Sequence, residues 1–431
     1  MSSAPSHVPP HATNNASTMA CPECGLEQQV PGVPPRFEAL CARCHKRLAR
    51  SPAWGLTGGL ALSLTVLFLL VPANLLPLMR ARLGASAGSG ISGVIQGLMR
   101  GIGTHEAYTG SGVRRLWNQG SPLLALLFAA LALVFPLLWA LLTVTVFGTL
   151  RLHRHPPWLG RTFRYAEVLR LWAMPDVLVL AGFVVYMRTE TELSAQVAAG
   201  GLCLIGAAAA LLAWPAVVDP RTVWQQIGPD HVPGQRPFCC DVCNLCVPES
   251  LEDQPCPRCH RRLRRRKHHA VERTAALVLA SFLLCAPAYY FPMSYTLQPN
   301  GLHTHRIIGS VILLIHDGYW YLGAIIAIVS IGIPFLKLTG LSWMLLRVRF
   351  PARRHLLVRT WVYRITHRIG RFSYTDPFIV ALMSPLLAFR GLVDVRPGPA
   401  ALPFALVVAM TMLAVRSFDP RLMWDATANA P

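Results

Sequence analysis

"DPRTVW" at residues 219–224 and "DPRLMW" at residues 419–424 repeat one charged hexapeptide 200 positions apart in a mostly apolar chain. Asp176 and Asp376 agree at the same offset, and each hexapeptide follows an apolar segment. Agreement of charged, proline and tryptophan positions at one offset predicts an internal duplication, in which the hexapeptide closes the last helix of each copy. Its Arg and Trp suit an anchor at the membrane–water interface. The alternative is a helix-end cap for neighbouring cytoplasmic domains.

The composition indicates a membrane protein. Of 431 residues, 53% are hydrophobic and only 14% are charged, whereas soluble domains carry about 25% charged residues. The formal net charge is +20. Because the arginines cluster between apolar segments, we expect them to face an anionic membrane surface rather than nucleic acid. Residues 1–20 are polar and lack the apolar core of a secretory signal, so we expect a disordered tail there.

Eight apolar segments are long enough to span, or nearly span, a bilayer, which takes about 20 residues per helix. They form two sets of four, at 54–79, 121–150, 171–187 and 194–218, and at 274–297, 318–346, 372–389 and 400–415. The predicted fold class is therefore an all-α polytopic membrane protein with two tandem four-helix transmembrane modules, residues 51–225 and 269–426.

Arginine-rich connections set the expected orientation. Residues 151–170 and 347–371 both join the second segment of a set to the third, and 219–273 joins the two sets. Because Lys and Arg favour the cytoplasmic side, we expect these connections and both termini there. The five arginines of loop 80–120 argue against this orientation. With an even number of spans each, the copies share one orientation and are parallel repeats.

Each module is preceded by two Cys-x-x-Cys pairs, within residues 21–50 and 236–268. Four thiolates at such spacing hold a tetrahedral metal ion and leave no open position, so we expect two small cytoplasmic zinc ribbons with one structural Zn²⁺ each. Rubredoxin-like iron takes the same ligands and stays an alternative, whereas disulfides are disfavoured on the reducing side. Cys239 and Cys246 lie beside the cysteine pairs of the second ribbon and could compete as ligands. The predicted ligands are Cys21, Cys24, Cys41 and Cys44, and Cys240, Cys243, Cys256 and Cys259.

Polar residues interrupt the spans of the second copy. Ser330, Lys337, Ser373, Asp376 and Thr411 fall at broadly similar depths, so they are candidates for one polar network in the bundle. A buried lysine is costly unless it is paired, and Asp376 is the expected partner. Such a pair can exchange a proton and drive a conformational cycle. The alternative has Lys337 reaching the interface and Asp376 capping its helix.

The first copy lacks most of this pattern. Only the aspartate persists, as Asp176. The other equivalents are apolar: Trp139 replaces the lysine, and Ala132, Ala173 and Leu211 replace the hydroxyl residues. We therefore expect the second copy to carry the mechanism and the first to be structural.

Two apolar stretches, 91–99 and 307–315, lie between the first and second spans of each copy and are too short to cross a bilayer. We expect them at the outer surface, either as contacts for a periplasmic partner or an incoming lipid, or as short packed helices.

Duplicated four-helix modules behind Cys-x-x-Cys ribbons, together with "SFDPRLMWD" at 417–425, resemble the PqiA/LetA family of bacterial inner-membrane proteins. The resemblance covers nearly the whole chain after the first 20 residues. It implies a lipid-transport role in a Gram-negative envelope, with phospholipid as cargo and a periplasmic MCE-domain protein of the PqiB/LetB type as partner. It also maps the eight predicted thiolate ligands and the five polar residues of the second copy onto those of the family.

The sequence also bears on other classes of function. It holds no phosphate-binding GxxxxGK[ST] loop and no nucleophile–base constellation of the hydrolase type, so we expect a transport component and not an enzyme. Two further functions stay open: a metal-ribbon scaffold or redox sensor anchored by the spans, and a proton-coupled carrier of small solutes.

Overall fold

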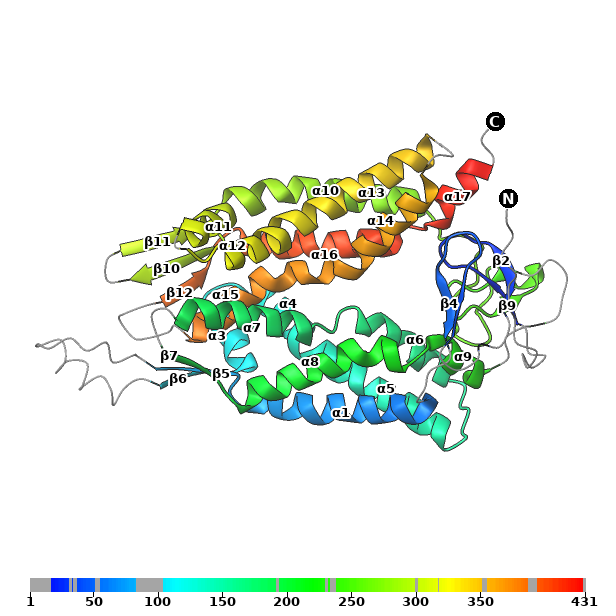
Figure 1. Cartoon of the computed structure of the whole chain (residues 1–431), viewed down its shortest axis with the longest axis horizontal. Coiled ribbons are helices and arrows are strands. Elements are labelled where there is room, and N and C mark those ends of the chain that lie inside the picture. The colour runs from blue at the N-terminus through cyan, green and yellow to red at the C-terminus, as the bar shows by residue number, and fades with distance from the viewer. Residues whose placement is uncertain are drawn as a thin grey trace, which may run out of the picture.

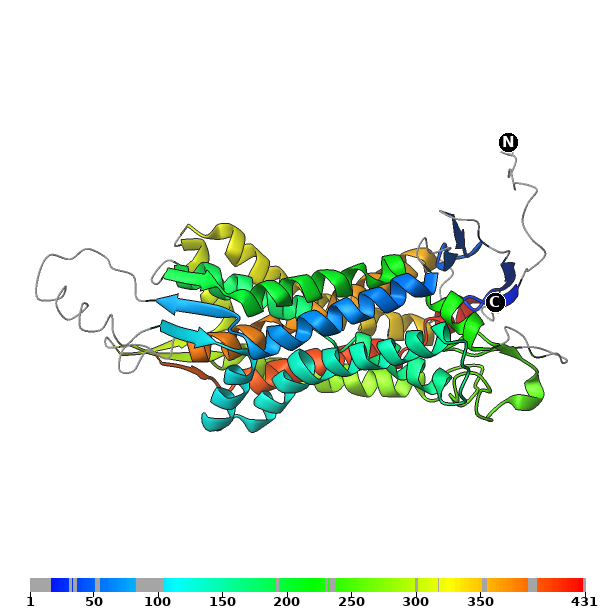
Figure 2. The same cartoon turned by 90° about the horizontal axis from the view of Figure 1, so that it is seen from below.

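The computed structural model is mostly helical and elongated. Long helices run side by side, with two cysteine-rich ribbons at one end and two three-stranded sheets at the other (Figure 1 and Figure 2). We name these the ribbon end and the sheet end. The expected outer stretch 91–99 lies outside the described residues. The structure describes residues 17–30, 33, 37–50, 55–82, 104–190, 194–228, 232, 238–298, 301–316, 318–350, 355–386 and 394–428.

The ribbons are built from short hairpins. Ribbon 1, residues 17–50, pairs β1 (Ser17–Ala20) with β2 (Glu27–Val30) and β3 (Glu38–Leu40) with β4 (Arg47–Arg50). Its first strand lies within the expected tail, whose residues 1–16 are outside the described part. Ribbon 2, residues 238–268, pairs β8 (Phe238–Cys239) with β9 (Cys246–Val247), followed by the 3₁₀ turn η2 (Glu249–Leu251).

Module 1 contains four long helical segments and a small sheet. Its elements are α1 (Gly55–Leu75), β5 (Met79–Arg82), β6 (Thr104–Ala107), α3 (Thr109–Asn118), α4 (Pro122–Ala129), the π-helix η1 (Ala130–Val134), α5 (Phe135–Arg151), α6 (Leu159–Arg170), α7 (Pro175–Glu190), β7 (Ser194–Val197), α8 (Ala199–Val217) and α9 (Pro220–Ile227).

Module 2 repeats this order of elements, which confirms the two tandem modules. They are α10 (Ala270–Tyr290), β10 (Ser294–Gln298), β11 (Gly301–His305), α11 (Ile307–His316), α12 (Trp320–Ile326), the π-helix η3 (Ala327–Gly332), α13 (Ile333–Arg349), α14 (Leu356–Ile369), the 3₁₀ turn η4 (Gly370–Tyr374), α15 (Thr375–Leu386), β12 (Asp394–Pro397), α16 (Ala401–Ser417) and α17 (Arg421–Ala428).

The duplication extends to irregular features. The sheets have the equivalent antiparallel orders β6-β5-β7 and β11-β10-β12. Each second span contains one π-helical turn directly before a helix whose second residue is proline, Pro136 or Pro334. Proline has no backbone N–H to donate to the carbonyl four residues earlier, and the wider turn accommodates this missing bond. In module 2 the carbonyl of Ser330 instead accepts a hydrogen bond from the Tyr289 hydroxyl at 2.7 Å.

The membrane-spanning segments differ from the expected ones in detail. Within the described residues, six helices are individually long and apolar enough to cross a bilayer, and the bent pair α16 and α17 forms a seventh candidate with a 49° angle. The expected third span of module 2, 372–389, instead begins within the 3₁₀ turn η4 and continues in α15, and η4 divides α15 from the preceding helix α14. The expected span 274–297 ends early, at Tyr290 of α10. Pro292 disfavours helix in the residue before it, and the chain turns into β10.

The two modules share a hydrophobic core. Their third spans pack together through α7 and α15, and the rings of Phe128 in α4 and Phe378 in α15 meet edge to face at 5.1 Å. A Cβ atom at Gly112 of α3 would lie 2.7 Å from the carbonyl oxygen of Ala381, so only glycine permits this approach. Arg115 also forms an ion pair with Asp394 at 2.8 Å. These contacts join the modules from their middle to the sheet end.

Candidate functional site

The eight predicted cysteine ligands form two buried groups, one in each ribbon. Within each group all four Sγ atoms lie within 4.8 Å of one another. The Sγ atoms of Cys21 and Cys44 and those of Cys24 and Cys41 lie 3.5 Å apart in ribbon 1, and those of Cys243 and Cys256 lie 3.6 Å apart in ribbon 2. Four sulfurs bound to one Zn²⁺ at about 2.3 Å lie about 3.8 Å apart. The groups therefore fit a tetrahedral metal ion, and these separations are far too long for disulfides.

A residue in the left-handed region follows each Cys-x-x-Cys pair. These residues are Gly25, His45, Asn244 and His260, with φ between 55° and 73°. Their N–H groups donate back to the carbonyl of the first cysteine of the pair. This tight turn brings both thiols to one side of the hairpin. Only Gly adopts the conformation without strain, and Asn tolerates it better than most residues.

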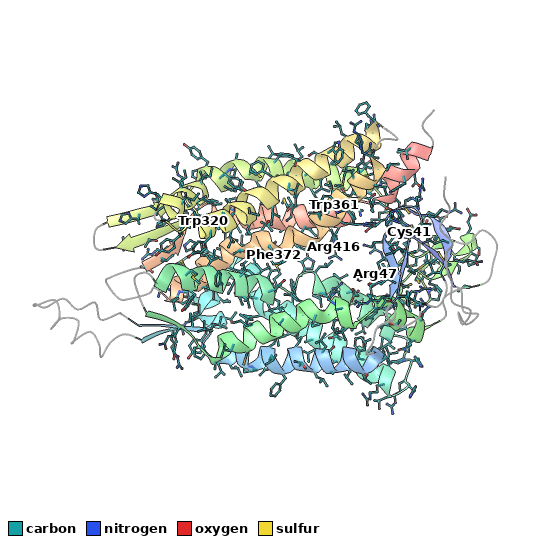
Figure 3. All side chains as sticks on the ribbon, viewed as in Figure 1. Cys41, Arg47, Trp320, Trp361, Phe372 and Arg416 are labelled. Atoms are coloured by element: carbon teal, nitrogen blue, oxygen red, sulfur yellow. A yellow bond between two sulfur atoms is a disulfide. The ribbon has the colours of Figure 1, made fainter. Side chains whose placement is uncertain are left out.

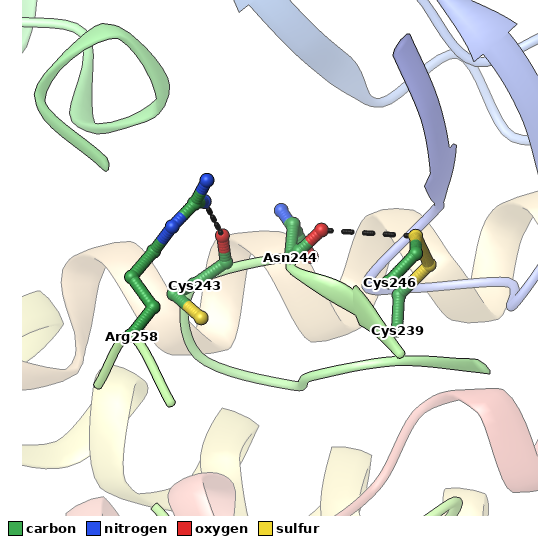
Figure 4. The surroundings of a disulfide bond; sticks show 5 residues. All are labelled: Cys239, Cys243, Asn244, Cys246 and Arg258. Atoms are coloured by element: carbon green, nitrogen blue, oxygen red, sulfur yellow. Dashed lines mark hydrogen bonds between the residues drawn. A yellow bond between two sulfur atoms is a disulfide. The ribbon is translucent and has the colours of Figure 1, made fainter. Parts of the chain in front are cut away.

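Cys239 and Cys246, which the sequence left as competing ligands, instead form a disulfide across β8 and β9, in contrast to the expectation that the reducing side disfavours disulfides (Figure 4). The bond ties the first hairpin of ribbon 2 together beside Cys240 and Cys243. It leaves the four predicted ligands of ribbon 2 as the group that could hold a metal ion.

The repeated hexapeptide joins each ribbon to the end of its own module. Asp219 caps α9 by accepting the N–H of Arg221 at 3.2 Å, and its other oxygen accepts the N–H of Arg50 at 2.9 Å. Asp419 accepts the N–H of Arg421 at 3.2 Å and that of Lys267 at 3.3 Å. Arg50 and Lys267 lie at the ends of the two ribbons. Of the two interpretations, the structure thus favours the helix-end cap.

The bodies of the ribbons, in contrast, dock on the opposite module. Arg364 of α14 pairs with Glu23 of ribbon 1 at 2.6 Å and donates to the carbonyl of Cys44 at 2.8 Å. Arg164 of α6 donates to the carbonyl of Cys259 in ribbon 2 at 3.1 Å. Arg164 and Arg364 are again 200 positions apart, so the duplicated modules hold the ribbons through equivalent arginines. The offset of 200 between the two arginines is visible in the sequence, where both were interpreted only as part of the basic connections.

The tryptophans of the hexapeptides follow the same crossed pattern. Trp224 of module 1 belongs to one core with Cys240 and Cys243 of ribbon 2. Trp424 of module 2 packs in the core of ribbon 1, with the guanidinium of Arg43 at 4.5 Å above its ring. Each hexapeptide therefore contacts both ribbons: its Asp binds the end of one, and its Trp packs on the other.

Charge also stabilises the contact at Asp419. Burial alone would raise the pKa of the Asp419 carboxyl, but the hydrogen bonds and positive charge of Arg421 outweigh it and hold that pKa below its usual value. Burial lowers the pKa of the Lys267 amine. The hydrogen bond to Asp425 raises the pKa of the Arg266 guanidinium, which donates to this carboxylate at 2.6 Å.

Gly160 of α6 gives a test of the docking of ribbon 2. A Cβ atom there would lie 1.8 Å from the carbonyl oxygen of Arg258, so we expect Gly160→Val to push ribbon 2 off α6. Overpacking of this kind costs about 1–3 kcal/mol or more. Limited proteolysis at the basic run 261–267 should become faster, and the melting temperature should fall. Gly148→Ala in α5, where a Cβ meets nothing within 4 Å, is the control and should behave as wild type. Unchanged proteolysis of Gly160→Val would contradict the docking.

The five polar residues predicted in module 2 are all buried, and they come from elements that pack together. Ser330 lies in η3, Lys337 in α13, Ser373 in η4, Asp376 in α15 and Thr411 in α16. The hydroxyl groups of Ser330 and Ser373 have no hydrogen-bond partner among the described residues. The bundle thus contains polar groups whose bonding capacity its own described side chains do not fill.

The structure places the partner of Lys337 differently from the prediction. Lys337 is 1% exposed, and its ammonium donates to the Thr411 hydroxyl at 3.2 Å. No ion pair within 4.0 Å joins this ammonium to Asp376. The reason is the divided third span. Gly370 of η4 lies against the lysine, and a Cβ there would be 2.6 Å from Lys337 Cε. Nothing in the sequence signalled that Gly370 makes room for the lysine.

Asp376 faces a separate small cavity towards the sheet end. The cavity has a volume of about 50 Å³, and Ser294, His305 and Ser310 also line it. These residues come from β10, β11 and α11. Such a volume is sufficient for ordered water. The polar residues therefore form two neighbouring groups, with Lys337 and Thr411 on one side and Asp376 on the other.

Module 1 fills the position of Lys337 with aromatic rings. Trp139 meets Trp214 edge to face at 4.9 Å, and Phe147 meets Trp214 at 5.6 Å. Both tryptophans are buried. The two copies therefore share a backbone plan but differ at this point in chemistry, one being polar and the other apolar.

Comparison with known proteins agrees with this architecture. The family described as "Paraquat-inducible protein A" matches the chain twice, over residues 56–228 and 271–428. Each match covers one helical module and includes its terminal hexapeptide. No solved structure matches the chain.

Several curated proteins match over nearly their full length. The chain is 28% identical to "Lipophilic envelope-spanning tunnel protein A" of Escherichia coli K12, with 94% of this chain and 91% of that protein covered. It is 28% identical to "Intermembrane transport protein PqiA" of the same organism, with 95% and 96% covered. It is 23% identical to a "Probable intermembrane transport protein" of Haemophilus influenzae, with 94% and 95% covered.

Proposed function

The chain belongs to the paraquat-inducible protein A family, and on this basis we propose that it is the inner-membrane component of a system that carries phospholipid between two membranes. Its relatives are named as intermembrane transport and envelope-spanning tunnel proteins. In this proposal the ribbon end lies in the cytoplasm, as the basic connections favour. The ribbons hold structural Zn²⁺, because four buried thiolates leave no position for a substrate.

The buried ammonium of Lys337 carries the proposal for the transport step. Charged groups inside membrane bundles are costly and commonly mark transport or proton pathways. Among the described residues the ammonium of Lys337 donates to one side chain, that of Thr411, and the same module contains two buried hydroxyl groups without described partners, those of Ser330 and Ser373. Asp376 and its cavity lie beyond, towards the sheet end. We propose that a change in the charge of this group accompanies a rearrangement around η4, possible because the third span is divided there.

The sheet end is the proposed docking site for a periplasmic MCE-domain protein. Helix α11 is apolar and exposes Ile308, Ile312, Leu313 and Ile315. Large exposed apolar side chains at one end of a molecule are typical of contacts with a protein or with lipid. Trp320 lies at the same end, opposite Cys41 and Arg47 at the ribbons (Figure 3). This arrangement separates the metal centres from the proposed partner by the length of the bundle.

Replacing Lys337 with methionine tests the transport step. We expect Lys337→Met to insert and fold normally, because a buried charge is often replaced by an apolar residue without loss of stability. Transfer of labelled phospholipid between membranes should fall by roughly tenfold or more. Membrane abundance and bound metal should not change.

Thr339→Val is the matched control on the same helix. Thr339 is exposed, and in the described part of the chain its hydroxyl donates only to backbone carbonyls of α13. This variant should transfer lipid at the wild-type rate. Full transfer by Lys337→Met at wild-type abundance would refute the assigned role of the lysine.

A further inference from the structure

A strongly cationic cavity lies at the ribbon end, away from Lys337. It has a volume of about 610 Å³, which is within the usual range for small-molecule sites. Its walls are ribbon 2, the beginning of α10, the end of α16 and one residue of α6. Among the described residues that line it, eight carry Arg or Lys side chains and one, Asp241, carries a carboxylate. Arg416 of α16 is one of these cations (Figure 3).

Some of these cations already have ion-pair or hydrogen-bond partners within the fold. Arg262 and Arg264 share the carboxylate of Asp253, and Arg266 pairs with Asp425. The Lys267 ammonium donates to the carbonyls of Arg416 and Phe418. These groups hold ribbon 2 in place and need no further ligand.

Three arginines in the cavity have no such partner. No carboxylate in the described part of the chain lies within ion-pair distance of Arg261, Arg273 or Arg416. They come from three different elements: the ribbon, the first turn of α10 and the last turn of α16. The three guanidinium groups line one cavity and repel one another, and an anion bound between them would offset this repulsion.

The duplication shows that ribbon folding does not require this charge. After its last cysteine, ribbon 1 continues as "HKRLARSP" at 45–52, with three cations. Ribbon 2 continues as "HRRLRRRK" at 260–267, with six. Both ribbons nevertheless form the same cysteine group and the same bond to their hexapeptide aspartate. The cysteine group and the bond to the aspartate therefore do not depend on the number of cations that follow the last cysteine.

We propose that this cavity binds the phosphate of an anionic phospholipid headgroup. Guanidinium groups bind phosphate through paired hydrogen bonds, which ammonium groups cannot match. The cavity includes Leu413, which is 42% exposed, at the side of α16. An apolar surface beside converging arginines suits an acyl chain attached to a charged headgroup. Basic pockets between helices at the cytoplasmic face are known to bind anionic lipid headgroups.

The site is distinct from the transport step. It rests on the membrane placement of the proposed function, but its residues do not include any of the five polar residues of module 2. Binding can be measured without transport, so failure of the Lys337 prediction would leave this proposal standing, and the reverse holds as well.

The test measures binding of short-chain phosphatidylglycerol to the purified full-length chain in a neutral detergent. Arg261→Gln combined with Arg273→Gln should weaken binding by roughly tenfold or more, because two charge-assisted contacts are lost. Arg265→Gln is the matched control. Arg265 belongs to the same basic run but pairs with Glu249 and does not line the cavity. It should bind within about twofold of wild type. Melting temperature and bound metal confirm that each variant is folded.

Two further ligands distinguish the sources of the phosphate. Phosphatidylcholine of the same chain length should bind more weakly, because its headgroup has no net charge, and added salt should weaken binding of phosphatidylglycerol. If glycerol phosphate binds as tightly as phosphatidylglycerol and is equally sensitive to the double variant, the site takes a soluble phosphate ester and the assignment to lipid is wrong. If the double variant and Arg265→Gln lose affinity equally, or neither does, the cavity is not an anion site.

Discussion

Changing Cys256 to serine is expected to abolish the proposed metal site of ribbon 2 and to unfold this ribbon. The four buried thiols of this ribbon converge on one point, and Cys256 supplies one of them. Binding of a structural Zn²⁺ by four ligands contributes about 10–16 kcal/mol of apparent folding free energy in small domains. The regular structure of ribbon 2 is one hairpin with two-residue strands, one 3₁₀ turn and one isolated bridge between Pro255 and Arg262. This ribbon cannot form a sufficient core without the metal.

Elemental analysis of the purified chain measures the outcome. Wild type should contain two zinc ions per chain, and Cys256→Ser should contain one. Cys203→Ser is the control, because Cys203 lies in α8 and outside both cysteine groups. That variant should keep both ions. Retention of both ions by Cys256→Ser would show that these thiols do not hold a metal, and iron in place of zinc would favour the redox alternative.

Because ribbon 2 packs on module 1, unfolding of this ribbon is expected to destabilise helices of module 1. Its core continues into Phe163 of α6 and Trp224 of α9, whose rings meet at 4.9 Å. Hydrogen exchange of Cys256→Ser should therefore increase in α6 and α9 of module 1. Each ribbon is bonded to the end of its own module and packs on the opposite module. Unfolding of one ribbon therefore affects both modules.

The duplication, the two ribbons and the grouping of their eight cysteines were predictable because they depend on local patterns. Hydropathy identifies long apolar helices, and the spacing of Cys-x-x-Cys pairs fixes a tetrahedral group. The offset of 200 residues relates Asp219 to Asp419, and the structure gives both the same cap and the same bond to a ribbon end.

The crossed docking and the pairing of Lys337 were not predictable from the same patterns. Which module a ribbon contacts depends on three-dimensional packing, because either module offers an equivalent arginine. The pairing of Lys337 depends on where the third span is divided. The 3₁₀ turn at Gly370–Tyr374 brings Gly370 against the lysine, and the ammonium meets Thr411 rather than Asp376. The small sheets arise from sequence between spans, where helical periodicity gives no signal.

Replacing Asp419 with alanine is expected to destabilise the ribbon end strongly. Its carboxylate is 1% exposed and accepts four hydrogen bonds, from the backbone of Arg421 and Lys267 and from two nitrogens of the Arg421 guanidinium. Removing it leaves a buried guanidinium without its carboxylate, which typically costs about 3–5 kcal/mol. The N-cap is lost as well, at about 1 kcal/mol. The melting temperature should fall by on the order of 10 °C.

The dependence on pH separates this ion pair from a simple packing defect. The pKa of Asp419 is depressed in the folded chain, and an unfolded Asp has a pKa of about 3.9. Its contribution to stability is therefore fully present above about pH 4 and is lost as the pH falls through the folded pKa. The melting temperatures of wild type and Asp419→Ala should differ most near neutral pH and converge under acid conditions. If the difference in melting temperature stays constant as the pH falls, Asp419 stabilises the fold through packing and not through its charge. The hexapeptide would then stabilise the ribbon end by packing alone.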